Sequence, residues 1–387
     1  MKILMVLEND FPPDVRVEKE ALSLQNQGHE VAIASICFTK NARKNNYKQI
    51  RLFKKYISCF IYKSGALALR IPFYFNFWKK YVRDIRNEFE YDAIHVHDLP
   101  LASVGLYAKK KFGVHYILDL HENYPALVDA SPYSSTFLGK LLISIKQWKN
   151  YEREMVPRAD KVITVIREMA ERINSVGVQK EKIEIVSNLP MLSEMKPVKG
   201  TPDHDFITLF YSGGINYHRG LQDIIRALPG MISVAENTRL WIVGKGSYLD
   251  RLNTLAAQLD IQDHVKFWGW KPFGEMVQIQ AKADIALIPH LRTEQSDNSS
   301  PNKLYEYMFY EKPVLASDCI SVARILSETE AGVVYASGNI DSCVSGFKKL
   351  LDQQYRRRLA ANGRKAVRKN LNWEVSSETI GNIYNNL

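Results

Sequence analysis

Short apolar runs alternate with longer amphipathic segments along the first half of the chain. Lys2–Leu7 is an almost continuous apolar run, typical of a strand buried on both faces. Arg16–Gln27 has apolar residues at helical spacing, and Gly28 follows it as a natural helix stop. Further strands are predicted at His29–Ser35, Ala93–His97, Tyr116–Leu120, Lys161–Ile166 and Ile183–Val186, with helices at Leu101–Phe112 and in an amphipathic stretch that ends near Pro157. Strands separated by helix-length segments indicate βαβ units and a parallel sheet.

A polar stretch rich in proline, 190–205, interrupts this alternation and predicts a linker. Beyond it, strands are predicted at Phe206–Tyr211, Arg239–Val243, Val265–Trp268, Ile285–Ile288, Val314–Ala316 and Gly332–Tyr335. The pattern therefore predicts an α/β protein with two Rossmann-like, doubly wound parallel-sheet domains, 1–189 and 206–370, that face a central cleft. Apolar residues at helical spacing predict one more helix in the tail, 371–387.

The composition is that of a globular protein, since 46% of the 387 residues are hydrophobic. No apolar stretch reaches the ~20 residues that a membrane-spanning helix needs. The first apolar run is too short for a secretory signal. The four cysteines contain no Cys-x-x-Cys pair, which argues against a disulfide framework or a structural zinc site. We therefore expect a cytoplasmic protein.

Nearly all of the excess positive charge lies in one segment, 40–86, which we call the basic aromatic segment. The formal net charge of the chain is +10, and this segment holds thirteen basic residues and one acidic residue, interleaved with aromatic side chains. One interpretation is a surface that docks on the anionic inner face of a membrane. The other is a helical insertion whose aromatic residues are core and whose lysines are solvated. The first is favoured, because Ile71–Trp78 is unusually apolar for a solvated loop. No nucleic-acid module is visible, so we expect no nucleic-acid partner.

The segment 297–317 predicts a helix with an anion site at its start. N-cap residue types there leave free backbone amides beside Lys303, and Glu306 lies on the same helix face. The residues at this start are Ser299, Ser300, Pro301 and Asn302. The alternative is an ordinary surface ion pair on an ordinary helix.

Glycines follow the predicted strand Phe206–Tyr211. Gly213 and Gly214 lie between this strand and a helix, where glycine lets the backbone approach a phosphate, and Arg219 can neutralise its charge. Gly244 has a similar place after the next predicted strand. The spacing matches neither a Walker loop nor the Gly-x-Gly-x-x-Gly fingerprint. The alternative is a tight strand-to-helix turn.

Together these elements resemble the retaining glycosyltransferases of family 4, which have the GT-B fold. The resemblance spans nearly the whole chain. Its most specific match is Pro301-x-Lys303-x-x-Glu306-x-Met308, followed by Lys312-Pro313-Val314. Its other matches are Phe11–Glu20, Gly28–Val31, Tyr91–His97, Asp119–Glu122, Ala159–Val165, Asn188, Leu240–Gly246 and Ala283–Ile285. The resemblance also implies that the tail helix crosses back to the first domain.

The resemblance implies that the second domain binds a nucleotide-sugar donor, linked to UDP or GDP. Arg219 and Lys303 would bind its diphosphate, and Glu306 would hold its ribose hydroxyls. The other implied donor-side residues are Gly213, Gly214, Gly244, Asn298, Ser299, Ser300, Pro301 and Asn302.

The resemblance implies that the first domain serves the acceptor. His121 would face the donor sugar and the reaction centre, and the loop with Pro13, Asp14 and Arg16 would lie near the acceptor. The implied activity is transfer of a sugar to a hydroxyl of a saccharide or lipid-linked acceptor, with retained anomeric configuration and without a metal or cofactor. Such enzymes assemble bacterial surface polysaccharides and glycolipids.

Two positions depart from the family pattern. The first glutamate of the Glu-x7-Glu signature falls on Asn298, whose amide can bind a hydroxyl but carries no negative charge. Asp297 or Glu294 would replace it after a loop shift. Gly214 stands where family members often have arginine, which removes one diphosphate contact. Two alternatives therefore stay open: a non-catalytic sugar-nucleotide-binding or membrane-docked scaffold protein, and a sugar-nucleotide epimerase of the same fold.

Two further patterns are compatible with metal binding. His95 and His97 lie on one face of a predicted strand and Asp98 follows, while Asp203-His204-Asp205 lies in the linker. We interpret the histidines as structural and the triplet as a solvated loop, so no metal-binding residue is predicted.

Overall fold

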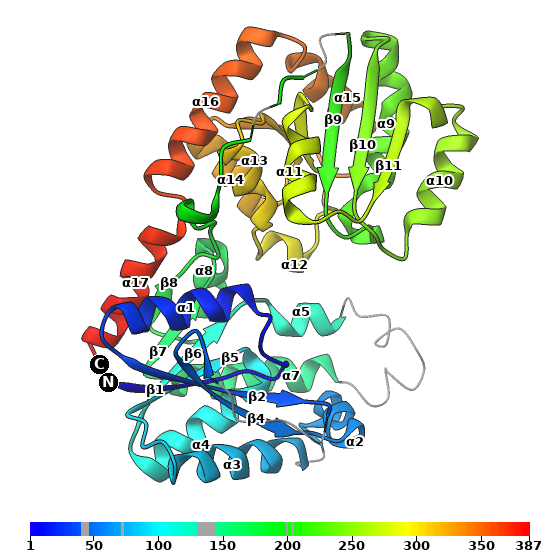
Figure 1. The fold of residues 1–387 in the computed structure, drawn as a ribbon. Coiled ribbons are helices and arrows are strands. Elements are labelled where there is room, and N and C mark those ends of the chain that lie inside the picture. The colour runs from blue at the N-terminus through cyan, green and yellow to red at the C-terminus, as the bar shows by residue number, and fades with distance from the viewer. Residues whose placement is uncertain (40–45, 71–72, 130–143, 199, 203–204) are drawn as a thin grey trace. The chain divides into compact units, whose positions relative to one another are not determined.

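The computed structural model describes the chain except for residues 40–45, 71–72, 130–143, 199 and 203–204. The described residues form two compact units: an N-terminal unit, Met1–Asn188 with the tail Val375–Leu387, and a C-terminal unit, Leu189–Glu374. Each unit is built on one sheet with helices on its faces (Figure 1). The predicted α/β fold class is therefore confirmed. Of the triplet 203–205 only Asp205 lies within the described residues.

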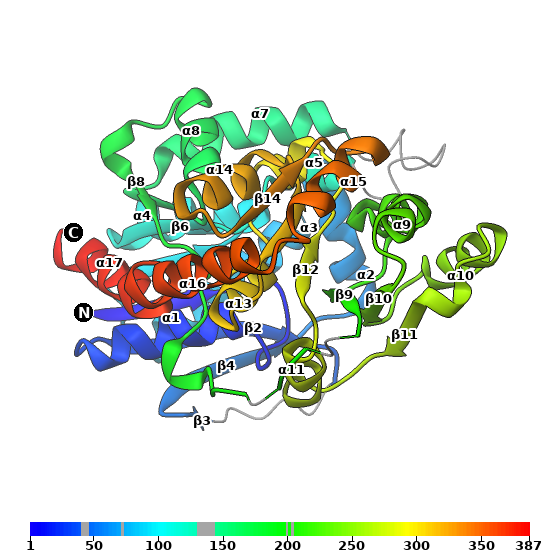
Figure 2. The same ribbon diagram turned by 90° about the horizontal axis from the view of Figure 1, so that it is seen from above.

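The sheet of the N-terminal unit has the strand order β3-β4-β2-β1-β5-β6-β7-β8 among the described residues. Its strands are β1 (Lys2–Val6), β2 (Glu30–Cys37), β3 (Asn46–Tyr47), β4 (Ile50–Tyr56), β5 (Ala93–His97), β6 (His115–Leu120), β7 (Lys161–Thr164) and β8 (Ile183–Ile185). Its helices are α1 (Val15–Asn26), α2 (Cys59–Lys63), α3 (Phe73–Arg86), α4 (Ala102–Phe112), α5 (Tyr124–Asp129), α7 (Ile145–Met155), α8 (Arg167–Ser175) and the tail helix α17 (Trp373–Asn385). Helices α3 and α4 cover one face of the sheet and α1 covers the other (Figure 1). In both ribbon views α17 lies beside α1 (Figure 2).

The sheet of the C-terminal unit is parallel throughout its described strands, in the order β11-β10-β9-β12-β13-β14. Its strands are β9 (Ile207–Ser212), β10 (Thr238–Val243), β11 (Val265–Gly269), β12 (Ile285–Ile288), β13 (Val314–Ser317) and β14 (Gly332–Tyr335). Its helices are α9 (Leu221–Val234), α10 (Leu249–Gln258), α11 (Phe273–Ala281), α12 (Glu294–Asp297), α13 (Asn302–Phe309), α14 (Ile320–Thr329), α15 (Ile340–Lys349) and α16 (Gln353–Lys369). One apolar cluster packs α9, α10 and α15 on one face, and a second packs α11, α13 and α14 on the other.

The basic aromatic segment contains a hairpin that the sequence pattern does not predict. Strands β3 and β4 are antiparallel to each other, and β4 continues the parallel sheet beside β2. Five of the eleven aromatic rings of the segment are buried in the core, and Tyr62 and Phe77 pack against it, as its second interpretation expects. The buried rings are Phe53, Tyr74, Phe75, Trp78 and Tyr81. Phe60 and Phe73 remain 72% and 56% exposed, and among the described residues no helix is apolar and long enough to cross a membrane.

Candidate active site

The topology of each sheet marks one edge as the place for a ligand. In open parallel sheets, ligands bind beyond the carboxyl ends of the strands, where the strand order reverses. This reversal lies between β1 and β5 in the N-terminal unit and between β9 and β12 in the C-terminal unit. His97 ends β5, Ser212 ends β9, and His290 follows β12 by two residues. The candidate residues therefore cluster where the fold favours binding.

Glycines let two loops of the C-terminal unit pack against each other at this edge. Gly213 and Gly244 have φ angles of +131° and +149°, which side chains rarely adopt. A Cβ atom on Gly244 would lie 1.9 Å from the carbonyl oxygen of Gly213. A Cβ atom on Gly213 would lie 2.5 Å from the Nζ atom of Lys303. The glycines thus bring the loop after β9 against the lysine amine.

Three basic side chains meet beside this loop. Arg219 donates a hydrogen bond from Nη1 to Nε2 of His290 at 2.6 Å, and the Lys303 amine lies 4.1 Å from the centroid of the Tyr211 ring. Burial and the charge of Arg219 lower the pKa of Lys303 to about 7, although Glu306 raises it. Burial and the charge of Lys303 hold the pKa of His290 well below its usual range. We call Arg219, His290 and Lys303 the basic cluster.

The basic cluster has unused donor capacity. Arg219 Nε and His290 Nδ1 are buried and have no hydrogen-bond partner among the described residues. Buried polar groups are normally paired, because an unpaired one costs about 1–3 kcal/mol. Because it is costly to leave these N–H groups buried and unpaired, the arrangement suits a bound anion.

The residues before α13 shape the loop beside the cluster. Pro301 takes the N-cap position without a capping side chain, which leaves first-turn amides of α13 without a side-chain acceptor at that position. Asn298 donates from Nδ2 to the carbonyl oxygen of Glu294 at 2.8 Å, and Ser300 lies 3.0 Å from the Tyr305 hydroxyl. The Ser299 carbonyl oxygen accepts from Ser321 at 2.5 Å.

Asp297 is committed to the local structure. Its two carboxylate oxygens accept hydrogen bonds from the Ile320 amide at 3.0 Å and from Arg292 at 3.1 Å. A loop shift that moved Asp297 toward a ligand would break both bonds, whereas Glu294 is exposed on α12. Glu306 is half-buried on α13, three residues after Lys303. Its negative charge raises the pKa of Lys303 and so favours the charged form of the lysine.

In the N-terminal unit, the loop before α1 is held by its own residues. Asp14, which follows Pro13, accepts from the amides of Arg16 and Val17, each at 3.1 Å, and so caps α1. Arg16 is 5% exposed, and its guanidinium lies 3.0 Å from Asp119 and 2.9 Å from Glu20. It also donates to the Val186 carbonyl oxygen at 2.9 Å. Arg16 therefore contacts residues within its unit.

His121 is a partly exposed neighbour of Asp119, the carboxylate that Arg16 contacts. Its side chain is 19% exposed, and Nε2 lies 2.9 Å from Asp119 Oδ2, while Nδ1 lies 3.6 Å from Asp98. Burial lowers the pKa of His121, but Asp98 and Asp119 outweigh burial and raise it to about 9. Burial raises the pKa of Asp119, but Arg16 and His121 hold it well below its usual range. His121 is therefore a cation at neutral pH, oriented by two carboxylates.

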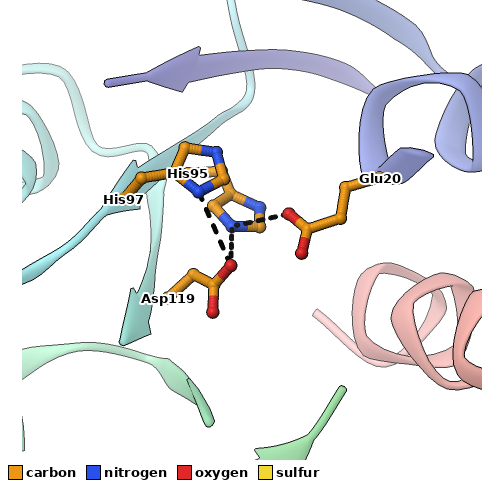
Figure 3. A group of neighbouring side chains, drawn as sticks. All are labelled: Glu20, His95, His97 and Asp119. Atoms are coloured by element: carbon orange, nitrogen blue, oxygen red, sulfur yellow. Dashed lines mark ion pairs between the residues drawn. The ribbon is translucent and has the colours of Figure 1, made fainter. Parts of the chain in front are cut away.

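Beneath His121 lies a buried group of four side chains: Glu20, His95, His97 and Asp119 (Figure 3). One ligand atom of each lies within 4.8 Å of the others, which is compact enough for a metal ion. However, the Arg16 guanidinium already contacts both carboxylates. A divalent cation would sit beside this fixed positive charge, so we interpret the group as a charge network that Arg16 completes.

Sequence reasoning missed three residues of these sites. Glu20 follows Arg16 by one helical turn, a spacing that signals an ion pair. His290 and Tyr384 carried no signal, because their partners Arg219 and His95 lie 71 and 289 residues away along the chain. His95 and His97, which we interpreted from the sequence as structural, are both buried within the group of four side chains.

Known proteins match the chain over both units. The family Glycosyltransferase Family 4 matches residues 15–189, and Glycosyl transferases group 1 matches residues 193–366. An uncharacterised glycosyltransferase of Methanocaldococcus jannaschii is 25% identical over 310 residues, which cover 76% of this chain and 75% of the relative. Phosphatidyl-myo-inositol mannosyltransferase of Mycobacterium leprae is 24% identical over 304 residues, covering 76% and 73%.

Solved structures support the fold. Sucrose-phosphate synthase from Thermosynechococcus elongatus superposes with a TM-score of 0.78 at 17% identity, covering 100% of this chain and 98% of the other. An Anabaena protein in complex with UDP superposes with a TM-score of 0.73 at 15% identity, covering all of both chains. With both halves matched and the two-unit α/β fold shared, the chain belongs to the GT-B glycosyltransferases of the group 1 and family 4 type.

Proposed function

We propose that this protein transfers a sugar from a UDP- or GDP-linked donor to a hydroxyl of a saccharide or lipid-linked acceptor, with retention of the anomeric configuration. The basic cluster carries the proposal, because it places two buried, unpaired N–H groups, of Arg219 and His290, beside the Lys303 amine at the carboxyl ends of β9 and β12. Its support from outside is the Anabaena structure of the same fold, which was solved with UDP. In bacteria, such a reaction fits the assembly of surface polysaccharide or glycolipid.

The donor half of the proposal follows from charge. Breaking the bond between the sugar C1 and the diphosphate leaves negative charge on the departing oxygen. Arg219, Lys303 and the first-turn amides of α13 would stabilise that charge, a contribution worth about 3–4 kcal/mol per well-placed donor in other enzymes. Protein cations would then do the work that a metal does elsewhere, so we propose a metal-independent reaction. Glu306 would accept hydrogen bonds from the ribose, and Asn298 would bind a hydroxyl through its amide.

The acceptor half of the proposal rests on His121. As a cation anchored by Asp98 and Asp119, His121 would donate a hydrogen bond to the substrate at the reaction centre. The acceptor oxygen forms its bond to C1 on the face from which the diphosphate departs, and the acceptor proton passes to the departing diphosphate oxygen. In this scheme Arg16 and Asp14 are positioning residues that hold the loop near the acceptor.

The experiment uses the purified full chain with UDP-glucose, UDP-galactose, UDP-N-acetylglucosamine and GDP-mannose. We expect one donor to raise the melting temperature, since a ligand that binds the folded state stabilises it. With an acceptor, the product should keep the donor's anomeric configuration by NMR. A donor that changes its sugar without an acceptor would indicate an epimerase. Binding without turnover would favour a non-catalytic sugar-nucleotide-binding protein. Asn298, which stands in place of the first signature glutamate, is the residue that supports this alternative.

We further propose that the protein docks on an anionic membrane from the cytoplasmic side. Along α3, Phe73, Asn76, Lys80 and Arg83 are exposed and recur at helical spacing, so they form one stripe. An aromatic ring beside two cations suits a lipid headgroup region. Lys54 and Lys55 of the same segment instead pair with Asp10 and Asp84.

A further inference from the structure

The tail helix places a tyrosine hydroxyl inside the N-terminal unit. Helix α17 lies against the end of α1, where Gln27 donates to the Ser377 carbonyl oxygen at 2.9 Å (Figures 1 and 2). A Cβ atom on Gly381 would lie 1.6 Å from the Gln27 side chain, so the two helices approach closely. In the last turn of α17, Tyr384 is 2% exposed, and its hydroxyl lies 2.7 Å from Nδ1 of His95.

The surroundings of Nε2 decide which nitrogen of His95 carries the proton. Burial lowers the pKa of His95 and holds the pKa of Tyr384 well above its usual range, so both groups are neutral at pH 7. Nε2 of His95 faces Asp119 Oδ2 at 3.7 Å and Glu20 Oε2 at 3.8 Å (Figure 3). A lone pair on Nε2 would oppose the anionic Asp119, whereas an N–H there is attracted to it. The favoured tautomer is Nε2–H, and Tyr384 then donates to Nδ1.

We propose that Tyr384 is a positioning residue: by donating to Nδ1, its hydroxyl holds the His95 ring with Nε2–H facing Asp119, the carboxylate that contacts His121. The chain of contacts runs from Tyr384 through His95 and Asp119 to His121. The inference rests on the proposed function only in assigning His121 to the reaction centre.

The charged and titratable groups around His95 come from four elements. Helix α1 contributes Arg16 and Glu20, β5 contributes His97 and the following Asp98, β6 contributes Asp119 and the following His121, and α17 contributes Tyr384. His97 stacks on His95 with ring centroids 4.6 Å apart. Burial lowers the pKa of His97 to about 3, so His97 adds no positive charge at neutral pH. Burial also raises the pKa of Glu20 to about 8, so Asp119 is the carboxylate whose charge Arg16 and His121 balance.

The test is NMR of the full chain with 15N-labelled histidine, which needs no substrate. In the wild type we expect His95 to show the Nε2–H pattern, and an Nδ1–H pattern would overturn the proposal without any variant. In Tyr384→Phe we expect mixed tautomers of His95 and a pKa of His121 shifted by about one unit, because Asp119 loses the Nε2–H that faces it while Arg16 still holds the carboxylate. An unchanged His95 and His121 in Tyr384→Phe would equally overturn it.

The matched control is Tyr91→Phe. Tyr91 is buried in the same unit, and its hydroxyl donates to the Val82 carbonyl oxygen rather than to a histidine. Tyr91→Phe should leave the pKa of His121 unchanged. An equal shift of this pKa in both variants would show a merely structural effect. If the protein transfers sugar, Tyr384→Phe should lower kcat about tenfold with the donor KM unchanged. Absence of transfer with the NMR shifts present would refute the proposed function and leave the positioning role standing.

Discussion

A histidine and a lysine of this protein have pKa values displaced in opposite directions. His121 stays charged because two carboxylates outweigh its burial, whereas Lys303 is easily discharged because burial and Arg219 act together. One partner of each residue, Asp98 for His121 and Arg219 for Lys303, is distant in sequence. The motif around Lys303 was therefore visible as a pattern, while the pKa of Lys303, lowered by burial and by the charge of Arg219, was not.

We expect UDP binding to depend on the protonation of Lys303. Its pKa of about 7 in the free protein means that affinity should fall as the pH rises above 7, by up to about tenfold per unit. At pH 8, binding should take up a proton, which calorimetry in buffers of different ionisation enthalpy measures. Lys303→Met should bind weakly and lose the proton uptake, whereas Lys282→Met, which removes an exposed lysine of the same unit, should behave as wild type. Proton uptake in Lys303→Met would contradict this assignment.

We expect the His121 charge to tie activity and stability to pH. A histidine whose pKa is raised from 6.5 to about 9 stabilises the folded state fully below pH 6.5, and this contribution, up to about 3 kcal/mol, is lost as the pH rises through 9. The melting temperature and the transfer rate should both fall between pH 8 and pH 10. In Asp119→Asn the fall in transfer rate should begin at lower pH. The same midpoint in both proteins would exclude His121 as the titrating group.

At the scale of elements, strands with a continuous apolar run were predicted well, whereas short strands and strands interrupted by charged residues were not. The buried strands β1, β5 and β12 appear close to their predicted bounds, because continuous apolar runs leave little choice. Strands β3 and β4 were missed, since β3 has two residues and Lys54 and Lys55 interrupt the end of β4. Their lysines pair with acids in other elements, which no local pattern reveals.

We expect the glycine loops to tolerate no side chain at Gly244. With a φ of +149° and the Gly213 carbonyl oxygen 1.9 Å from the added atom, Gly244→Ala should destabilise the protein by about 1–3 kcal/mol and abolish UDP binding. Gly274→Ala is the matched control: it lies in α11, has no positive φ and has open space around its Cβ. Chemical denaturation should show Gly274→Ala as neutral or stabilised by about 0.5–1 kcal/mol. Equal effects of the two substitutions would contradict this account of the loop.

We expect the exposed stripe of α3 to mediate binding to anionic vesicles. Phe73→Ser with Lys80→Glu should reduce flotation with phosphatidylglycerol vesicles at low salt, because the substitutions remove an apolar anchor and reverse one charge. Lys348→Glu with Lys349→Glu reverses two exposed charges on α15 and should float as wild type. Equal flotation of all three proteins would remove α3 from the membrane proposal.

At the scale of the whole molecule, the two units divide the chemistry. The C-terminal unit holds the basic cluster, and the N-terminal unit holds His121 and the buried network beneath it. The fold and the family were readable from the sequence, because the βαβ alternation and the Pro301–Met308 pattern already resembled the glycosyltransferase families that match residues 15–189 and 193–366. The donor base, the sugar and the acceptor were not, because no pattern in the sequence identifies the contacts that select them.

The central claim is that the basic cluster binds a diphosphate, and calorimetric titration with UDP and GDP tests it most directly. We predict that the wild type binds at least one of them and that Arg219→Ala weakens this binding by about 100-fold, since a charge-assisted contact contributes about 1.5–3 kcal/mol. Arg226→Ala, which removes an exposed arginine of α9 in the same unit, should bind as the wild type. Unchanged nucleotide affinity in a folded Arg219→Ala protein would contradict the account.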